Sequence, residues 1–414
     1  FMRKILYSTL IIATTLVNSN VNAQDCSSGT RYKQAVFTNV TKTADVKYGS
    51  NYNQAGDQLV DLSLDIYTPD GDTDDDRPVI LLAHGGSFIG GNKSDMQTIC
   101  EQMAKMGYVA VSIQYRLLNI NPLWLTQPAT LALEFKKEVA RSMHDMKAAI
   151  RFLRKSAANG NPYGINSNII IAGGSSAGAI LADHVTYLND LSKIPNETDL
   201  IAYINTQGGL EGNSGNPGYS SEPQMALSMC GALMDTTIVV AGQQPFFGVH
   251  TAPDQTVPYL FGQPKPAGMT VQVDLYGDSL IYKRALNQGV YAAYKNYETG
   301  GHCDFGPDFF DIMMAFVYDN VCVQNLSLMS NPNKITFSVY PNPATSNVTI
   351  DIPGNIWNST VQFIDMTGRV VHTQTLNAYE STYTIDVNDF KSGIYTVRIQ
   401  TEDGRTDVKK LVIE

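Results

Sequence analysis

One serine in the sequence stands in a pattern that suits a nucleophile. Residues 174–178 read GSSAG, which fits G-x-S-x-G, and they lie between an apolar run at 168–172 and a helical pattern at 176–188. A serine on such a sharp turn needs small neighbours two residues away on either side, because larger side chains would collide with the strand and the helix. Counting between the two glycines makes Ser176, rather than Ser175, the predicted nucleophile. The alternative is a glycine-serine loop that only caps a helix.

A second motif suits the binding of a developing negative charge. Residues 84–88 read HGGSF and directly follow the apolar run 79–83. A turn at the carboxyl end of a buried strand can point backbone N–H groups into the crevice where open α/β sheets bind their ligands. Two or three such donors stabilise the oxyanion of a tetrahedral intermediate. The predicted donors are the N–H groups of Gly86, Ser87 and Ala177.

A nucleophilic serine also needs a base, and the base needs an acid that orients it. The histidines of the chain are His84, His144, His184, His250, His302 and His372. One large class of hydrolases uses the chain order serine, acid, histidine, which favours a late histidine. His302 follows a pair of glycines, and Asp254 follows the expected strand 246–249. The sequence therefore predicts His302 as the base and Asp254 as the acid, with Asp274 and Asp278 as alternative acids.

The patterning of the chain predicts a mostly parallel sheet that positions these residues. From about Leu59 to Val321, strand-like runs alternate with helical patterns, which is typical of a sheet covered by helices on both faces. The expected strands are 59–67 at an antiparallel edge, 79–83, 108–113, 168–172, 238–241, 246–249 and 271–276, and the expected helices are 96–105, 139–157 and 176–188. The predicted fold class is therefore α/β.

The C-terminal part of the chain follows another pattern, in which short strands succeed one another without helices. They are expected at 337–340, 348–352, 361–365, 369–373, 383–387, 394–400 and 407–413. Turn residues such as Pro353-Gly354 and Asp403-Gly404 separate them. So many short strands in so short a segment predict a small all-β sandwich.

The N-terminus and the charge balance bear on location and partners. Arg3 and Lys4 precede an apolar run from Ile5 to Val17, and Ala23 ends the stretch, as in a secretory signal peptide. The chain has 29 Lys plus Arg against 39 Asp plus Glu, so we expect no nucleic-acid partner. No later run is long and apolar enough to predict a membrane span. The predicted units are a signal peptide at 1–23, a catalytic domain at 24–325, a linker at 326–334 and a β-sandwich at 335–414.

The chain has an odd number of cysteines, so at least one is expected to be free or intermolecular. They are Cys26, Cys100, Cys230, Cys303 and Cys322, and all follow the predicted cleavage site. In an oxidising compartment such residues form disulfides. Connectivity cannot be deduced from sequence. The pairing that we hypothesise is Cys303 with Cys322, because it would clamp the loop that carries His302.

Over residues 57–320 the sequence resembles the α/β-hydrolase superfamily, and within it the bacterial carboxylesterase and lipase branch with an HGG oxyanion loop. Besides the serine and HGG motifs, the similar segments are Tyr115-Arg116-Leu117, residues 145–153 and the acid loop 250–258. The resemblance implies Ser176 as nucleophile, His302 as general acid and base, and Asp254 as the residue that orients it. Ser87 is a departure, because the commoner motif has a third glycine there.

The C-terminal region resembles the type IX secretion sorting domain of Bacteroidota proteins. The similar motifs are YPNPA at 340–344, GIYTVR at 393–398 and KKLVIE at 409–414. The resemblance implies passage through the inner membrane by means of the signal peptide, then export by the type IX secretion machinery to the cell surface or the medium. A carbohydrate-binding sandwich is the alternative.

Together these features predict a secreted serine carboxylester hydrolase that acts through an acyl-enzyme on a small-molecule or polymeric ester, with no metal or organic cofactor. The stretch 117–133 is a long insertion near the oxyanion loop, and the expected pocket residues are Phe88, Trp124 and Leu125. Ordinary packing is the alternative for that stretch. The other functions left open are an acetyl or feruloyl esterase that trims polysaccharides, a polyester hydrolase, a peptidase of the prolyl-oligopeptidase type and a non-catalytic surface-binding protein.

Overall fold

The computed structural model describes residue 26, residues 29–323 and, in the C-terminal unit, residues 337–352, 359–376, 382–401 and 406–414. The predicted signal peptide at 1–23 and linker at 326–334 lie outside these described residues. Within the described ranges, no helix combines the length and the apolar character that crossing a membrane requires.

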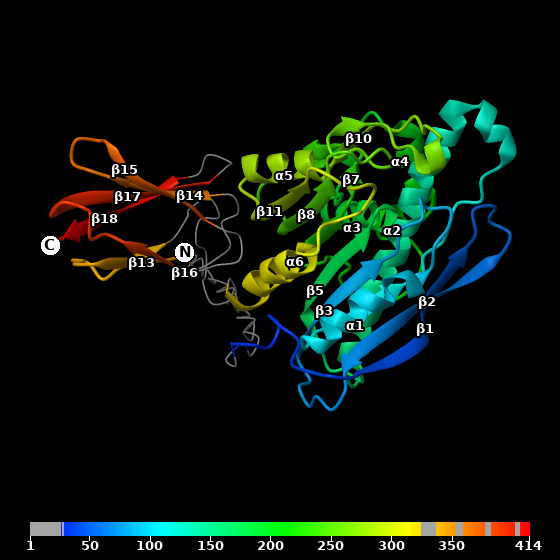
Figure 1. The fold of residues 1–414 in the computed structure, drawn as a ribbon. Coiled ribbons are helices and arrows are strands. Elements are labelled where there is room, and N and C mark those ends of the chain that lie inside the picture. Colours follow the sequence, from blue (N-terminus) through cyan, green and yellow to red (C-terminus); the bar gives the residue numbers. More distant parts are fainter. Residues whose placement is uncertain (1–25, 27–28, 324–336, 353–358, 377–381, 402–405) are drawn as a thin grey trace, which may run out of the picture.

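The larger unit is built around an eight-stranded sheet (Figure 1). Its strands are β1 (Val40–Tyr52), β2 (Leu59–Pro69), β3 (Arg77–Ala83), β4 (Val109–Ile113), β5 (Ile165–Ser175), β6 (Ala226–Met229), β8 (Phe246–Thr251) and β11 (Ala292–Tyr297). Their order in the sheet is β1-β2-β4-β3-β5-β6-β8-β11. The β1/β2 and β2/β4 pairings are antiparallel and all later pairings are parallel. The predicted mostly parallel sheet is confirmed.

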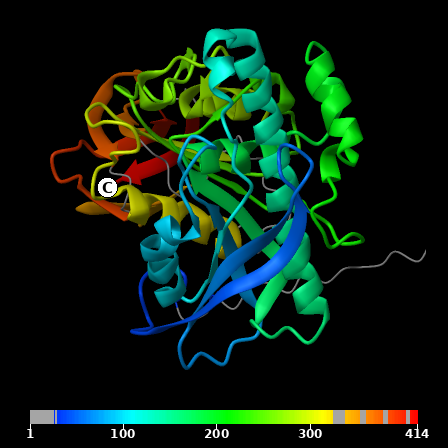
Figure 2. The ribbon, with the colours of Figure 1, turned by 90° about the vertical axis from the view of Figure 1, so that its right-hand side faces the viewer.

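Helices cover both faces of this sheet (Figures 1 and 2). The α-helices are α1 (Gln97–Lys105), α2 (Pro128–Ala158), α3 (Ala177–Tyr187), α4 (Thr198–Thr206), α5 (Asp278–Asn287) and α6 (Phe309–Tyr318). The 3-10 helices are η1 (Lys93–Met96), η2 (Pro122–Thr126), η3 (Leu191–Lys193), η4 (Gly209–Glu211), η5 (Thr236–Ile238) and η6 (Pro266–Gly268), and η7 (Asp319–Val323) is a π-helix. Side chains alternate along β3, so Val79 and Leu81 pack with α2 and α3, whereas Ile80 and Leu82 pack with α1 and α6.

The chain changes direction across the sheet next to β3. It runs from β3 to β4 on one side, and then returns to place β5 on the other side of β3. The loops that follow β3 and β5 therefore leave the same edge of the sheet beside each other. In open α/β sheets this is the place where ligands bind.

Several predicted elements need correction. The segment 59–67 is a strand but not the edge, because β1 pairs outside it. Residues 238–241 form no strand, and of 271–276 only the end belongs to one, β10 (Leu275–Gly277). That strand joins β7 (Ala232–Leu233) and β9 (Phe261–Gly262) in a small separate sheet. The strands β1 and β6 were not predicted, because β1 is mostly exposed and polar and β6 has only four residues.

The C-terminal unit consists of antiparallel strands in two sheets. The strands are β12 (Ser338–Tyr340), β13 (Asn347–Asp351), β14 (Ser359–Ile364), β15 (Val370–Leu376), β16 (Thr382–Asp386), β17 (Gly393–Thr401) and β18 (Thr406–Ile413). The sheet orders are β12-β13-β16 and β15-β14-β17-β18. Inward residues of both sheets, among them Val348, Ile350, Phe363 and Val397, form one apolar core. The predicted all-β unit and its seven strands are confirmed.

The disulfide pairing differs from the hypothesis. Cys303 is bonded to Cys230, and Cys322 is bonded to Cys26, with Cα–Cα distances of 5.4 and 5.8 Å. Helix α6 lies between Cys303 and Cys322, and ten helical residues carry the chain roughly 15 Å away. Nearness in sequence was therefore a misleading guide. Cys100, which belongs to α1, is free and buried.

Candidate active site

The turn between β5 and α3 holds Ser176 in an unusual backbone conformation. Its φ and ψ are 56° and −118°, outside the regions that most residues adopt. A Cβ on Gly174 would lie 2.3 Å from the carbonyl carbon of Gly178, and one on Gly178 would lie 2.1 Å from the oxygen of Ala83. Both positions therefore require glycine, and the strained turn presents the Ser176 hydroxyl at the edge of the sheet.

Three of the predicted site residues meet at this turn. The Ser176 Oγ lies 2.7 Å from the His302 Nε2, and the His302 Nδ1 lies 2.7 Å from the Asp254 Oδ2. These residues are 126 and 48 positions apart in the sequence. Asp254 lies in the loop that follows β8, and His302 lies in the loop that follows β11, which pairs with β8. The alternative acids lie elsewhere: Asp274 is exposed, and Asp278 contacts another histidine, His250.

Asp254 is held as a carboxylate. Its side chain is fully buried, and its Oδ1 accepts hydrogen bonds from the N–H groups of Thr256 and Val257, at 2.8 and 3.1 Å. Burial alone favours the neutral acid, but hydrogen bonds from His250 and His302 outweigh it and hold the pKa of Asp254 well below its usual range. The residue therefore offers His302 a fixed negative charge.

The predicted oxyanion loop lies against Ser176. A Cβ on Gly85 would approach the Ser176 Cβ to 3.3 Å. Gly86 and Ser87 have φ values of 109° and 58°, which turn the backbone sharply after β3. Among the described residues, the N–H groups of Gly86, Ser87 and Ala177 have no hydrogen-bond acceptor. These three donors are therefore free to bind a ligand beside the serine.

Contacts between the HGG segment and the Tyr-Arg-Leu segment hold this loop in place. The His84 ring stacks on Tyr115 with centroids 4.3 Å apart, and the Tyr115 hydroxyl donates to the His84 carbonyl at 2.8 Å. Burial lowers the pKa of His84, so its neutral ring donates from Nδ1 to the carbonyl of Gly85. Arg116 pairs with Asp145 on α2 at 2.8 Å. The sequence similarity in these segments thus corresponds to contacts that fix the loop.

A disulfide joins the histidine loop to the neighbouring strand. Cys303, next to His302, is bonded to Cys230, which follows β6. The preceding residue of that strand, Met229, accepts a hydrogen bond from the Ser176 N–H at 2.8 Å. The bond therefore ties the loop that carries His302 to the backbone that supports the serine turn.

Metal ligands are not available in this arrangement. Within the described part of the chain, only Cys230, His302 and Cys303 bring ligand atoms close enough together for a metal ion. The two sulfur atoms are bonded to each other, so neither is the thiolate that binds metals.

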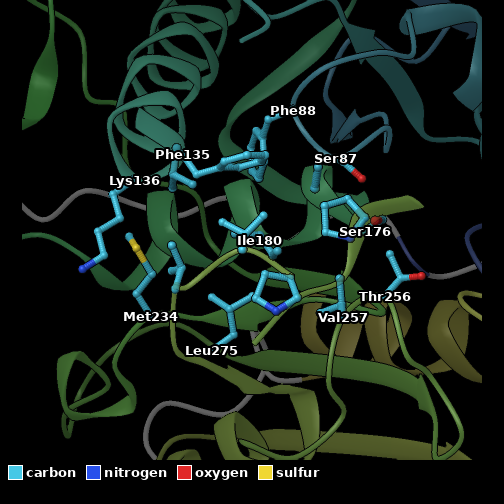
Figure 3. Close-up of a pocket in the computed structure, with 16 residues that line it drawn as sticks. Ser87, Phe88, Phe135, Lys136, Ser176, Ile180, Met234, Thr256, Val257 and Leu275 are labelled. Atoms are coloured by element: carbon cyan, nitrogen blue, oxygen red, sulfur yellow. The ribbon is translucent and has the colours of Figure 1, made fainter. Parts of the chain in front are cut away.

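A pocket with a volume of about 50 Å³, open to solvent, begins at Ser176 (Figure 3). Its lining is mostly apolar: Phe88, Phe135, Val139, Ala177, Ile180, Met234, Val257, Pro264, Pro266, Val271, Val273 and Leu275, with Ser87, Lys136, Ser176 and Thr256. Ser87 and Ser176 lie at one end, and Lys136 and Met234 at the other (Figure 3). The pocket is thus an apolar recess that opens next to the serine hydroxyl.

Only one of the predicted pocket residues lines this recess. Phe88 does, whereas Trp124 packs against the core and Leu125 is 53% exposed on η2. None of the residues 117–133 lines the recess, and the nearest lining residue on that side is Phe135 of α2, two positions after this stretch. The opposite wall comes from Pro264, Pro266, Val271, Val273 and Leu275, which no motif predicted to lie there.

The comparisons agree with the predicted families. Residues 64–213 match the BD-FAE family, and residues 338–414 match the family described as a secretion system C-terminal sorting domain. Two separate segments of the chain therefore match an esterase-like α/β-hydrolase family and a secretion sorting domain. The first match includes Ser176 but ends before Asp254 and His302. No curated protein matches the chain.

Among solved structures, similar chains include esterase 2 of Thermogutta terrifontis in several forms. The form phosphorylated by paraoxon is 20% identical over 69% of this chain and 94% of that chain, with a TM-score of 0.47. The apo form is 20% identical over 72% of this chain and 98% of that chain, with a TM-score of 0.46.

Proposed function

We propose that the protein is a secreted serine carboxylester hydrolase in which Ser176, His302 and Asp254 form the catalytic triad. The observation that carries this proposal is the continuous chain of 2.7 Å contacts from the Ser176 hydroxyl through His302 to the Asp254 carboxylate. A nucleophile within hydrogen-bond reach of a base, which is itself oriented by an acid, is the arrangement that acyl transfer requires.

The reaction proceeds in two halves. The His302 Nε2 takes the Ser176 proton as the serine oxygen bonds to the ester carbonyl carbon, and the carbonyl oxygen becomes an oxyanion. His302 then returns the proton to the leaving alcohol, which departs as the C–O bond breaks and leaves an acyl-enzyme. Water, deprotonated by His302, attacks the acyl carbon in the same way and releases the acid. Asp254 stabilises the imidazolium formed at each step.

The oxyanion is assigned to the free N–H groups of Gly86, Ser87 and Ala177. Each such donor contributes roughly 3 to 4 kcal/mol to stabilisation of the transition state in comparable sites. The side chain at position 87 need not take part, because the donor is the main chain. Serine in place of the commoner third glycine is therefore compatible with this role.

The apolar recess suits the acyl group of the ester. Its walls, such as Phe135, Ile180 and Leu275, offer apolar contact and no array of hydrogen-bond partners for sugar hydroxyls. We therefore assign the acyl chain to this pocket and the alcohol to the open side of Ser176. This assignment favours esters with an apolar acyl group.

For the location, we propose export through the signal peptide at 1–23 and the type IX machinery. The match of residues 338–414 to a secretion sorting domain supports this route. The paired cysteines, which suit an oxidising compartment, support it independently. We place the catalytic domain at 24–325 and the sorting domain at 335–414.

The test is hydrolysis of a series of p-nitrophenyl esters, from acetate to palmitate, by the mature chain and two serine variants. We expect Ser176→Ala to lower kcat by at least about 10³-fold. The adjacent Ser175→Ala is the matched control and should keep most of the activity, since Ser175 makes only long contacts to the sulfurs of the disulfide. Full activity in Ser176→Ala, or no hydrolysis by the folded parent, would refute the proposal.

A further inference from the structure

A chain of buried polar side chains continues behind Asp254. His250 is fully buried, with its Nε2 3.2 Å from the Asp254 Oδ2 and its Nδ1 3.1 Å from the Asp278 Oδ2. The Asp254 oxygen is the same atom that accepts the hydrogen bond from His302. Two imidazole rings therefore share one carboxylate oxygen, one ring facing Ser176 and the other facing the interior.

The contacts of His250 determine its protonation state. Each ring nitrogen faces only oxygen acceptors: Asp278 at Nδ1, and Asp254 with the carbonyl of Val257 at Nε2. A neutral imidazole would turn a lone pair toward one of these oxygens, whereas the imidazolium donates from both nitrogens. Burial opposes the charge, but the hydrogen bonds with Asp254 and Asp278 outweigh it and raise the pKa of His250 to about 9.

The hydrogen-bond donors around Ser228, Asp278 and Asp183 show where a second buried proton lies. The Ser228 hydroxyl lies 2.6 Å from Asp278 and 2.8 Å from Asp183, yet it can donate to only one of them. Asp278 also accepts from His250 and from the N–H of Gly231, whereas the Asp183 Oδ1 has no partner. Asp278 is therefore the carboxylate, and Asp183 is a neutral acid that donates to Ser228.

The pKa of Asp183 agrees with this assignment. Burial raises it well above the usual range, and the charge of Asp278 raises it further. Of the four buried side chains behind the site, Asp254 and Asp278 are therefore carboxylates, His250 is a cation and Asp183 is a neutral acid. The buried cation lies between two buried carboxylates, a combination that compensates the charges.

We propose that His250 is a positively charged positioning residue of the site, which anchors Asp254 and weakens the hold of that carboxylate on the proton of His302. This role rests on the proposed function. The contacts at 2.7 and 3.2 Å to one oxygen put the nearest nitrogens of the two rings no more than about 6 Å apart. At that distance a buried positive charge on His250 disfavours a second positive charge on the His302 ring, so its removal should make that ring easier to protonate.

The groups that face this pair come from several elements. Around His250 they are Asp254, Asp278, Asp183 and Tyr259, with Tyr294 near Asp278, and around His302 they are Ser176, Asp254 and the disulfide of Cys303. Burial raises the pKa of Tyr294, so its hydroxyl stays neutral. His250 is therefore the cation that balances Asp254 from the interior side.

The test compares pH profiles of kcat/KM for the mature chain, His250→Gln and Asp183→Asn. The acid limb of this profile reports protonation of the essential base of the free enzyme, the role that the proposed function assigns to His302. Glutamine removes the positive charge, so the limb should move to higher pH by about one unit. Asparagine at 183 replaces an acid that is already neutral, so the limb should stay in place. A loss in His250→Gln that is equal at every pH would show a merely structural role and overturn the proposal.

A second measurement needs no variant and no activity. In the parent labelled with ¹⁵N-histidine, NMR at pH 8 should show one imidazole with both nitrogens protonated. Burial lowers the pKa of His144 and His184 to about 4, so neither supplies this signal. Six neutral rings would overturn the proposal even if His250→Gln fails to fold. Failure of the proposed function is distinguishable, because it would abolish ester hydrolysis in the parent while leaving this signal present.

Discussion

The two halves of the candidate site are held in place by different means. On the side of β3 and β5, Ser176 and the N–H groups of Gly86 and Ser87 are positioned by backbone turns with positive φ and by glycines packed against carbonyl groups. On the side of β8 and β11, Asp254 and His302 are positioned by side-chain contacts, a disulfide and buried charges.

This difference determines how each half should respond to change. A backbone turn packed at van der Waals distance has no room for even one methyl group, because interiors are close-packed. A side chain held by several partners can lose one of them and keep part of its position. We therefore expect a single substitution in the serine half to remove most of the activity, whereas a single substitution in the histidine half should remove only part of it.

Among changes outside the proposed triad, the largest effect on activity is expected from Gly178→Ala. The added Cβ would lie 2.1 Å from the Ala83 oxygen and 2.6 Å from the His84 oxygen, both backbone atoms at the start of the oxyanion loop. The loop must then move relative to Ser176, and displacements of about 1 Å cost roughly 100-fold in rate. We expect kcat/KM to fall by about 100-fold or more, with a loss of about 1 to 3 kcal/mol in unfolding free energy.

The matched control for this variant lies in the other half, at Gly301. It adjoins His302, its φ is not in the left-handed region, and a Cβ there would meet no atom within 4 Å. Gly301→Ala should therefore change kcat/KM by less than about threefold. Equal losses in the two variants would remove the proposed distinction between the halves.

An intermediate effect is expected from removing the disulfide of the histidine half. The double variant Cys230→Ser, Cys303→Ser frees the His302 loop from β6, so we expect kcat/KM to fall about tenfold. Unfolding free energy should fall by roughly 2 to 5 kcal/mol, as for other native disulfides. Initial rates and thermal unfolding of the purified variants measure both quantities.

The other disulfide provides the comparison. Cys26→Ser with Cys322→Ser opens a loop closed over 296 positions, so its loss of stability should be at least as large. That bond touches none of the site residues, so kcat/KM below the unfolding temperature should be unchanged. A rate loss common to both double variants would mean that the bonds act only through stability.

The same contrast explains what the sequence could predict. The Ser176 turn and the loop at Gly86 are each marked by a short motif of glycines and small residues, so each can be recognised locally even though the two loops pack against each other. The predicted strands β3, β5 and β8 also have apolar runs of their own. His302 was predicted from its late place in the chain after a pair of glycines, and Asp254 from its place after an expected strand. The structure brings both together with Ser176.

Features that depend on distant partners were missed. Neither the pairing of Cys303 with Cys230 nor the packing of residues 264–275 over the recess leaves a local signal. The place of Asp278 against His250 depends on α5 meeting β8, which no motif specifies. For this contact, the sequence shows only that His250 lies near the end of a strand and that Asp278 lies at the start of a helix.

The dependence of stability on pH tests the buried half of the site without touching Ser176. His250 has a pKa of about 9 in the folded protein, above its ordinary value near 6.5. The folded state therefore binds its proton more tightly, so this stabilisation is complete below about pH 6.5 and is lost as pH rises through 9. We expect unfolding free energy to fall by roughly 3 kcal/mol or less between those values. Guanidinium unfolding at pH 6.5 and 9.5 measures it, and His250→Gln should lack this fall; an unchanged fall in the variant would assign it to other groups.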